Sequence, residues 1–306
     1  GGWHQCQSDF HGADRGGGYF DPGLAPLALP ALCKRRTARV IDRFPVFTST
    51  LSKKKMARLI FLGTSSAVPD ANHQYAQLLL LGRDHTLMVD CGSNPDIRLR
   101  QLGLNIEVPS DLLITHFHPD HSAGLWTFLL SAWLLGRKTP LTIHGLETTI
   151  HSIKTVLQLY QWDDWPGLFQ VEFNPVRDEE MFTVLRNEEF TVYSSPVRHV
   201  IPNIGLRIEI RPSGMVLAYS SDTEPCPQLD KLAENADILI HEATGRGAWH
   251  SSPAQAGQVA QRSGASSLYL IHYPTLNTDL RQWLAQAQAE FDGPVSLAED
   301  NLAIDL

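Results

Sequence analysis

Apolar runs of strand length alternate with longer amphipathic segments from Arg58 to the end of the chain. Short apolar runs bounded by turn residues are typical of buried strands, whereas apolar residues that recur every three or four positions are typical of helices. The pattern predicts strands at Arg58–Leu62, Ala76–Leu81, Thr86–Asp90, Leu112–Thr115, Leu141–His144, Leu168–Phe173, Thr183–Arg186, Phe190–Ser194, Gly205–Ile210, Met215–Tyr219, Ile238–His241 and Ser267–His272. It predicts helices at Ser122–Leu135, Leu146–Tyr160, Gln228–Asn235, Pro253–Ser263 and Thr278–Phe291.

This order of strands and helices indicates an α/β protein in which two sheets pack face to face and helices cover their outer faces. A chain of 306 residues with 43% hydrophobic content is long enough to bury a core of that size. The sequence therefore predicts a four-layer αββα sandwich.

Residues 1–55 differ in composition from the rest of the chain. They contain repeated glycines, scattered prolines and two basic clusters, Lys34–Arg36 and Lys53–Lys55. We interpret residues 1–55 as an atypical N-terminal extension of non-native origin and residues 56–306 as the catalytic domain. The alternative is that the extension is a basic arm for an acidic partner.

Three imidazoles and one carboxylate stand within the six residues from His116 to His121. A predicted strand ends just before this segment and a predicted helix begins just after it. His116 and His118 are two positions apart, so they project to the same side of extended backbone, whereas Asp120 and His121 open the helix. Ring nitrogens beside a carboxylate suit a divalent transition metal, most often zinc.

Three later residues have a common local pattern, in which an apolar run ends close to one potential metal ligand. They are His199, Asp222 and His272. Each of them alone is explained as well by a structural role. Because they follow the first cluster in order along the chain, together they favour a metal site.

The spacing of His116, His118, Asp120 and His121 resembles the HxHxDH motif of the metallo-β-lactamase superfamily. The resemblance implies the αββα sandwich of that superfamily and a site for two metal ions. It also implies the ligands: His116, His118 and His199 for the first metal, Asp120, His121 and His272 for the second, and Asp222 as the bridge.

A site of this kind implies two Zn²⁺ ions as cofactors, with Mn²⁺ or Fe²⁺ as alternatives. Two such ions hold a bridging water, lower its pKa and so supply hydroxide near neutral pH. We therefore expect a dinuclear metal-dependent hydrolase that uses a metal-bridging hydroxide. Asp120 is expected to orient or deprotonate this nucleophile in addition to binding metal.

Four segments resemble the ribonuclease Z and zinc phosphodiesterase branch of this superfamily: Arg58–Pro69, Leu87–Gly92, His241–Thr244 and His250–Gly257. In Leu87–Gly92, the branch places a carboxylate, here Asp90, that supports the metal ligands. In the last two segments it places a His, here His250, which a Glu, here Glu242, holds in position. His250 is expected to protonate the leaving oxygen, because a departing alkoxide needs a proton. The alternative for His250 is a surface position before a helix.

The chain departs from ribonuclease Z in ways that disfavour tRNA as the substrate. The family's PxKxRN loop appears as Pro69–Gln74 without its basic residues, and the long arm that clamps tRNA is replaced by the short aromatic stretch Thr155–Phe173. Residues 1–55 carry 9 of the 25 Lys and Arg but 4 of the 33 Asp and Glu, so residues 56–306 have a net charge of −13. Proteins that grip polyanions usually present basic surfaces.

We therefore expect a small-molecule or nucleotide phosphodiester as the substrate. A tRNA 3′-end endonuclease is one alternative, and a lactonase, esterase or β-lactamase is another. Trp162, Trp165 and Phe169 are interpreted as packing or homodimer contacts, with a substrate pocket as the alternative.

The four cysteines, Cys6, Cys33, Cys91 and Cys226, are far apart, which favours a reduced, cytoplasmic protein. No apolar run is long enough to predict a membrane span.

Overall fold

The computed structural model describes residues 57–211, 213–245 and 248–306. The predicted extension at residues 1–55 lies outside the described residues, so its boundary with the catalytic domain and its origin stay predictions. Among the helices that the structure describes, none combines the length and the apolar character needed to cross a membrane.

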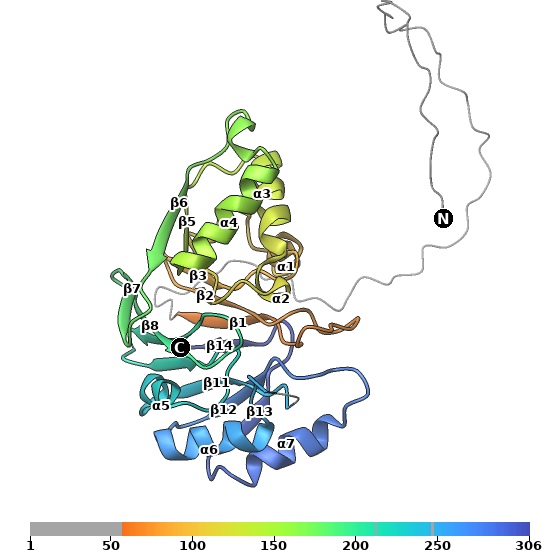
Figure 1. Cartoon of the computed structure of the whole chain (residues 1–306), viewed down its shortest axis with the longest axis vertical. Helices are drawn as coiled ribbons and strands as arrows, with labels where there is room; N and C mark the ends of the chain where they lie inside the picture. The colour runs from red at the N-terminus through yellow and green to blue at the C-terminus, as the bar shows by residue number, and fades with distance from the viewer. Residues whose placement is uncertain (1–56, 212, 246–247) are drawn as a thin grey trace, which may run out of the picture. The chain divides into compact units, whose positions relative to one another are not determined.

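Within the described residues, two seven-stranded sheets form the centre of the molecule (Figure 1). The first sheet has the strand order β14-β1-β2-β3-β4-β5-β6, and the second has the order β13-β12-β11-β10-β9-β8-β7. The strands of the first sheet are β1 Arg58–Gly63, β2 Gln77–Leu81, β3 Thr86–Val89, β4 Asp111–Leu113, β5 Leu141–Leu146, β6 Val171–Val176 and β14 Ala303–Asp305. Those of the second are β7 Phe182–Arg186, β8 Phe190–Val197, β9 Asn203–Ile210, β10 Val216–Tyr219, β11 Ile238–Glu242, β12 Leu268–Ile271 and β13 Val295–Leu297.

The helices cover the outer faces of the two sheets. They are α1 Pro95–Gln101, α2 Pro119–Ser122, α3 Gly124–Leu134, α4 Glu147–Leu159, the 3₁₀ turn η1 Trp162–Asp164, α5 Pro227–Ala233, α6 Pro253–Ser263 and α7 Leu280–Gln288. Figure 1 shows α1 to α4 beside the first sheet and α5 to α7 beside the second. The predicted αββα sandwich is therefore confirmed.

The alternation of side chains along the strands divides the core into three layers. In β1, Leu59 and Phe61 pack between the two sheets, whereas Ile60 and Leu62 pack beneath the helices of the first sheet. In β11, Ile240 faces the centre of the sandwich, and its neighbour Leu239 packs beneath α5 to α7. Successive strand residues point to opposite faces, so nearly continuous apolar runs supply both layers.

Several elements differ from the sequence-based prediction. The short edge strands β13 and β14 were not predicted, because a three-residue strand with partly exposed side chains carries no clear period. The seven-residue helix α1 was not predicted either. The helix predicted at Ser122–Leu135 corresponds to α3, which begins at Gly124, and the separate short helix α2 precedes it. The strand predicted at Leu168–Phe173 begins only at Val171 and continues through Pro175, which the edge position of β6 tolerates.

Strands β3 to β6 pair in parallel, and so do β10 to β13. The carboxyl ends of parallel strands meet at one edge of a sheet, where ligand sites of open α/β sheets are usually found. The residues that follow β3, β4, β10, β11 and β12 are therefore brought close together.

Candidate metal centre

The predicted ligands converge at the carboxyl ends of strands from both sheets. His116 follows β4, His199 follows β8, Asp222 follows β10 and His272 follows β12. Two groups of four residues have potential ligand atoms within 4.8 Å of one another: His116, His118, His199 and Asp222 in the first, and Asp120, His121, Asp222 and His272 in the second. Asp222 belongs to both groups.

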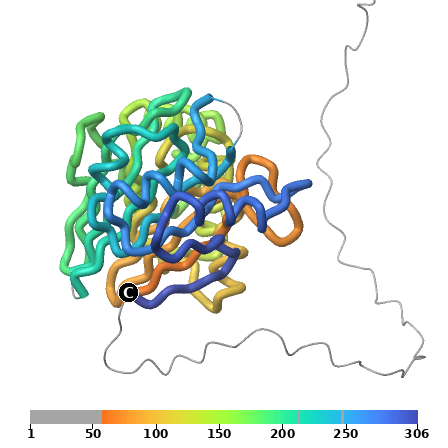
Figure 2. Tube along the Cα trace, turned by 90° about the horizontal axis from the view of Figure 1, so that it is seen from below, coloured from red at the N-terminus to blue at the C-terminus, as the bar shows by residue number. Residues whose placement is uncertain are grey.

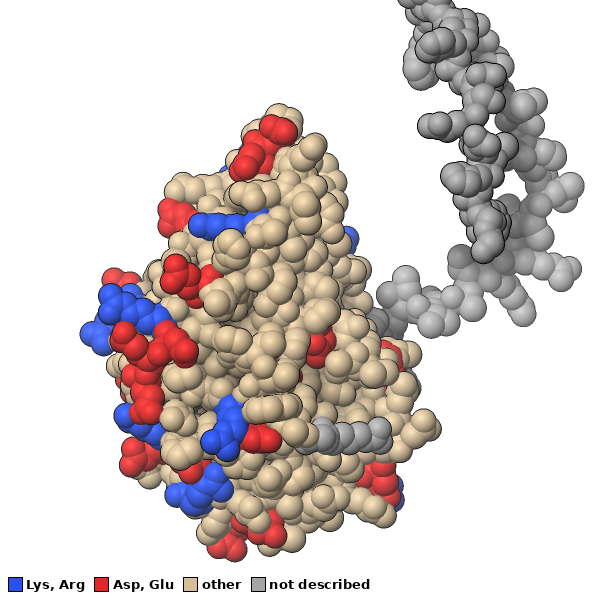
Figure 3. Space-filling model, viewed as in Figure 1, with Lys and Arg blue, Asp and Glu red and all other residues tan. Residues whose placement is uncertain are grey.

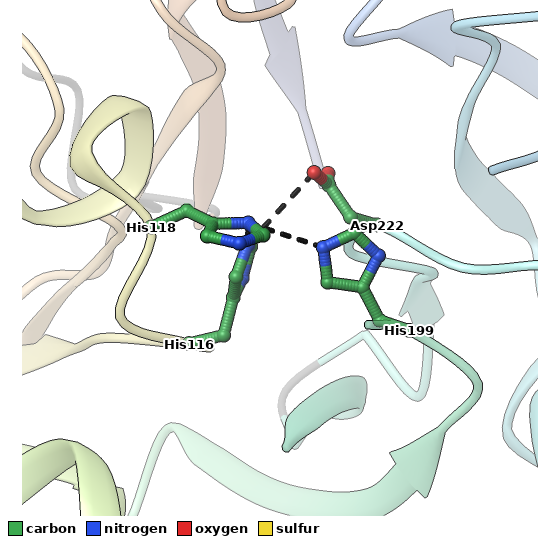
Figure 4. A group of neighbouring side chains, drawn as sticks. All are labelled: His116, His118, His199 and Asp222. Atoms are coloured by element: carbon green, nitrogen blue, oxygen red, sulfur yellow. Dashed lines mark hydrogen bonds and ion pairs between the residues drawn. The ribbon is translucent and has the colours of Figure 1, made fainter. Parts of the chain in front are cut away.

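The first group contains three imidazoles whose ring nitrogens point toward one centre (Figure 4). The Nδ1 atom of His118 lies 3.0 Å from Nε2 of His116 and 3.1 Å from Nε2 of His199. The edge of a tetrahedron around zinc, with Zn–N bonds of about 2.05 Å, is about 3.3 Å long. The spacing of the three nitrogens is therefore close to that of a tetrahedral site.

Hydrogen bonds on the far side of the rings determine which nitrogens carry protons. The Thr115 hydroxyl donates to the carboxylate of Asp90, 2.9 Å away, so its oxygen accepts from Nδ1 of His116 at 3.0 Å. Nδ1 of His199 donates to the carbonyl oxygen of Trp249, 3.0 Å away. Burial lowers the pKa of His116 well below its ordinary value and also lowers that of His199. Both rings are thus neutral and direct the lone pair of Nε2 toward His118.

The Nε2 lone pairs of His116 and His199 both point toward His118, and each of them needs its own hydrogen-bond donor. Nδ1 of His118 can donate to one of the two Nε2 atoms but not to both. A single cation at the centre would accept all three lone pairs. The donor set of the first group therefore fits a divalent metal ion.

The second group contains two histidines held in the same manner. Nδ1 of His121 donates to Asp90 at 2.8 Å. The Thr244 hydroxyl donates to the backbone oxygen of His272, so it accepts from Nδ1 of that ring at 2.9 Å. Hydrogen bonds that fix the outer nitrogen of a ligating histidine are a regular feature of protein metal sites.

Asp222 lies between the two groups. Its Oδ2 atom is 3.9 Å from Nε2 of His116, 3.3 Å from Nε2 of His121 and 3.4 Å from Nε2 of His272. Burial would raise the pKa of Asp222, but His272 and His121 outweigh this effect and hold it well below the ordinary value. This buried carboxylate is therefore ionised and faces both groups.

Two buried polar atoms at the centre make no hydrogen bond of good geometry among the described residues: Nε2 of His121, although it lies 3.3 Å from Oδ2 of Asp222, and Oδ1 of Asp222. Leaving such atoms unpaired is costly, roughly 1–3 kcal/mol each, and more for a charged group. Metal coordination would satisfy both, so the second group also fits a divalent ion. Asp120 completes this group, with Oδ2 3.3 Å from Nε2 of His272 and 3.6 Å from Nε2 of His121.

The turn that follows β3 packs against the backbone of Asp120 and His121. The backbone N–H of Cys91 donates to the carbonyl oxygen of His121 at 2.7 Å. A Cβ atom on Gly92 would stand 1.6 Å from the carbonyl oxygen of Asp120, so only glycine fits there. Asp90 has a φ of 63°, a left-handed conformation that Asp tolerates better than most residues. This close packing orients the Asp90 carboxylate toward Thr115 and His121.

His250 and Glu242 form a third cluster beside the two groups of candidate metal ligands. Nδ1 of His250 lies 2.9 Å from Oε1 of Glu242, and the His250 ring stacks on that of His272 with centroids 5.8 Å apart. Glu242 is fully buried and also accepts hydrogen bonds from the backbone N–H groups of Thr223, Ser251 and Thr244. These bonds hold the carboxylate in one position.

The surroundings of His250 favour its protonated form. Burial would lower the pKa of His250, but the hydrogen bond from its ring to Glu242 and the negative charges of Glu242, Asp222 and Asp120 outweigh burial and raise it. His250 is one-fifth exposed at its side chain and lines an open cavity, so it can reach a substrate.

The metal-ligand groups open into a cavity of about 630 Å³. It is lined by Ser66, Ala67, Val68, His118, Pro119, Asp120, Asp222, Thr244, His250, His272, Pro274, Thr275, Leu276 and Asn277. Among these described residues there is no lysine or arginine. A cavity of this size accommodates a small molecule.

Trp162, Trp165 and Phe169, which lie between α4 and β6, do not line this cavity. The Trp165 ring stacks on Trp133 of α3 with centroids 5.0 Å apart, and Trp162 packs edge-on against Phe173 of β6. Phe169 is buried in the core beneath the helices. These contacts agree with the packing interpretation, and no aromatic side chain of this stretch lines the cavity.

The sequence did not identify every residue around the site. The sequence indicated no role for Thr115 or Thr244, yet their hydroxyls accept from Nδ1 of His116 and of His272. Tyr219, whose hydroxyl lies 3.5 Å from Asp90, and the backbone oxygen of Trp249 carried no signal in the sequence. Cys91 and Cys226 are buried free thiols, whereas Cys6 and Cys33 lie outside the described residues.

Comparison with solved structures identifies the class of protein. The metallo-β-lactamase fold protein YhfI from Bacillus subtilis matches with a TM-score of 0.70 and 22% identity over 83% of this chain and all of that one. The short form of human tRNase Z matches with a TM-score of 0.63 and 24% identity over 81% of this chain and 98% of that one. The protein has the metallo-β-lactamase fold.

Comparison of sequences identifies the family within this fold. Residues 57–291 match the family model described as anti-Pycsar protein Apyc1, and the chain belongs to this family. A ribonuclease Z of Mycolicibacterium gilvum is 32% identical over 275 residues, which span 80% of this chain and 94% of that protein. The expected ribonuclease Z-like branch of the superfamily is thus confirmed, and the protein is a metal-dependent hydrolase.

Proposed function

We propose that this protein hydrolyses the phosphodiester bond of small substrates at a dinuclear zinc site. His116, His118 and His199 would hold one ion, Asp120, His121 and His272 the other, and Asp222 would bridge them. Bound ions would lower the pKa of a shared water and neutralise charge that develops on the phosphoryl oxygens. The histidine hydrogen bonds, the unpaired buried atoms and the low pKa of Asp222 support this assignment.

The observation that carries the proposal is the pair formed by His250 and Glu242. When the phosphodiester bond breaks, the leaving group is an alkoxide. An alkoxide leaves poorly unless a positioned acid supplies a proton. His250 lines the cavity beside the proposed metal ligands, and the hydrogen bond to the buried Glu242 raises the pKa of its ring and orients it. Asp120, which also lines the cavity, would orient the attacking water with its ionised carboxylate.

The absence of lysine and arginine from the described cavity lining supports a small substrate. A chain of phosphates would need several basic contacts. On the face shown in Figure 3, acidic and basic side chains are interspersed along the side formed by β7, β8 and α5, and they form no extended basic surface. The second candidate, tRNA 3′-end processing, is favoured by the 32% identity to a ribonuclease Z.

One experiment separates the candidates. Hydrolysis of bis(p-nitrophenyl) phosphate, a precursor tRNA and a panel of lactones would be measured with and without a chelator. We expect chelator-sensitive hydrolysis of the phosphodiester. Faster turnover of the precursor tRNA would replace this proposal with ribonuclease Z activity, and turnover of lactones alone would replace it with a carboxylic-ester hydrolase.

A further inference from the structure

Two loops far apart in the sequence form one wall of the cavity. We call Ser66–Val68, which follows β1, and Pro274–Asn277, which follows β12, the two-loop rim. Figure 2 shows the loop after β1 in orange and the loop after β12 in blue, side by side and projecting from the same side of the molecule. The backbone N–H of Ser66 donates to the carbonyl oxygen of Tyr273 at 3.1 Å, which joins the loops at their base. All seven residues of the rim line the cavity that contains Asp120, His250 and His272.

The base of the first loop is held rigidly. The carboxylate of Asp300 accepts hydrogen bonds from the Thr64 hydroxyl at 2.8 Å, from the backbone N–H of Gln74 at 2.9 Å and from Arg98 at 2.7 Å. The carbonyl oxygen of Thr64 accepts from the backbone N–H of the metal-ligand candidate His272 at 2.8 Å. The rim is therefore placed in a defined position relative to the candidate metal centre.

The tips of the rim carry exposed apolar side chains. Val68 is 58% exposed and Leu276 is 49% exposed, although both line the cavity. With Ala67 and Pro274 they make this wall largely apolar. Exposed apolar side chains that line a cavity favour binding of an apolar or planar group.

One polar group in this wall lacks a partner. The hydroxyl oxygen of Thr275 is buried and has no hydrogen-bond partner among the described residues. Rotation about χ1 of a threonine exchanges the hydroxyl with the methyl group, so the hydroxyl can turn toward a ligand in the cavity. An unpaired hydroxyl within an apolar wall is suited to recognise one polar edge of a bound ring.

We propose that the two-loop rim determines which phosphodiesters are hydrolysed, an inference that rests on the proposed function. Val68 and Leu276 hold an uncharged, planar ring attached to one side of the phosphodiester, and the Thr275 hydroxyl bonds the polar edge of that ring.

Three p-nitrophenyl phosphodiesters test this proposal, because they share a leaving group and differ in the second substituent: methyl, phenyl or thymidin-5′-yl. We expect kcat/KM to rise from methyl to phenyl to thymidinyl. Leu276→Ala and Val68→Ala should each reduce the preference for phenyl over methyl by about 3- to 10-fold. Thr275→Val should reduce the preference for thymidinyl over phenyl by about 3- to 10-fold, whereas Thr275→Ser should preserve it.

The matched control is Leu134→Ala, a leucine of α3 that is 68% exposed and does not line the cavity. It should leave all three preferences unchanged. Hydrolysis of the methyl ester by the unmodified protein tests the proposed function itself, because that substrate does not need the rim. If this ester is hydrolysed but the rim variants keep the original preferences, or lose activity equally on all three esters, the rim proposal is wrong and the phosphodiesterase proposal stands.

Discussion

Nδ1 of His250 lies 2.9 Å from Oε1 of Glu242, whose carboxylate is buried, while the His250 ring lines the cavity. Three backbone N–H groups hold Glu242 in place, so the position of His250 depends on the loops after β10 and β11. The carboxylate thereby orients the ring and raises its pKa. This relationship gives the proposed acid catalyst its main support.

His250→Ala should reduce turnover of an alkyl phosphodiester by about 10²- to 10⁴-fold, the usual magnitude for general acid catalysis. With p-nitrophenolate as the leaving group the loss should be much smaller, because that anion departs without a proton. Steady-state kinetics on the two substrate types measure the difference. His151→Ala, at an exposed histidine of α4, is the control. Equal losses on both substrates would show that His250 binds substrate or supports the metals.

The pH profile of the alkyl substrate should report the titration of His250. Since its folded pKa is raised, the protonated acid persists to higher pH, and activity should fall only as pH rises through that value. Glu242→Gln removes the neighbouring charge, so the fall should move to lower pH. Rates measured across the pH range for both proteins test this shift. An unchanged descending limb would mean that another group titrates there.

Asp90→Asn should weaken zinc binding by about 10- to 100-fold, because Asp90 orients His121 and, through Thr115, His116. Zinc affinity can be measured by competition with a chromophoric chelator. The chain offers a matched control in Asp111→Asn. Asp111 makes a similar 2.8 Å contact with His144, on β4 and β5, outside the ligand groups. If both variants bind zinc with equal affinity, Asp90 does not support the site.

Asp222→Ala should remove metal and activity together, because this carboxylate faces both ligand groups. Asp120→Ala should reduce turnover and weaken only the second ion. Elemental analysis of the purified variants, alongside kinetics, separates the two outcomes. The unmodified active protein should contain about two equivalents of transition metal per chain. Fewer than one equivalent in the active protein would rule out the dinuclear site.

A chain that begins at Met56 should fold and retain catalysis, because all proposed ligands and both sheets lie beyond that residue. Thermal unfolding, metal content and phosphodiester hydrolysis of the shortened protein would be compared with those of the full chain. A soluble, metal-loaded but inactive protein would show that residues 1–55 contribute to the site or to an assembly.

Local patterns in the sequence determined much of the fold. The strand β1 and the helix α6 were predicted at nearly their observed positions, because apolar periodicity and a Ser252 cap are local signals. β13 and β14 were missed because they are three-residue edge strands with partly exposed residues, and β14 pairs only with the distant strand β1. The sequence also predicted as metal ligands the His and Asp residues that come together in the two groups, because their order along the chain resembles a known motif.

Only the tertiary structure decided how those residues meet. His118 and His199 are 81 positions apart and Asp120 and His272 are 152 apart, yet their ligand atoms lie 3.1 and 3.3 Å from each other. The Thr115 and Thr244 hydroxyls, the unpaired Thr275 hydroxyl and the two-loop rim were equally invisible in the sequence. The sequence by itself specifies which side chains are available and which strand each one follows. Their protonation and their shared cavity arise from packing the two sheets against each other, which brings the carboxyl ends of distant strands together.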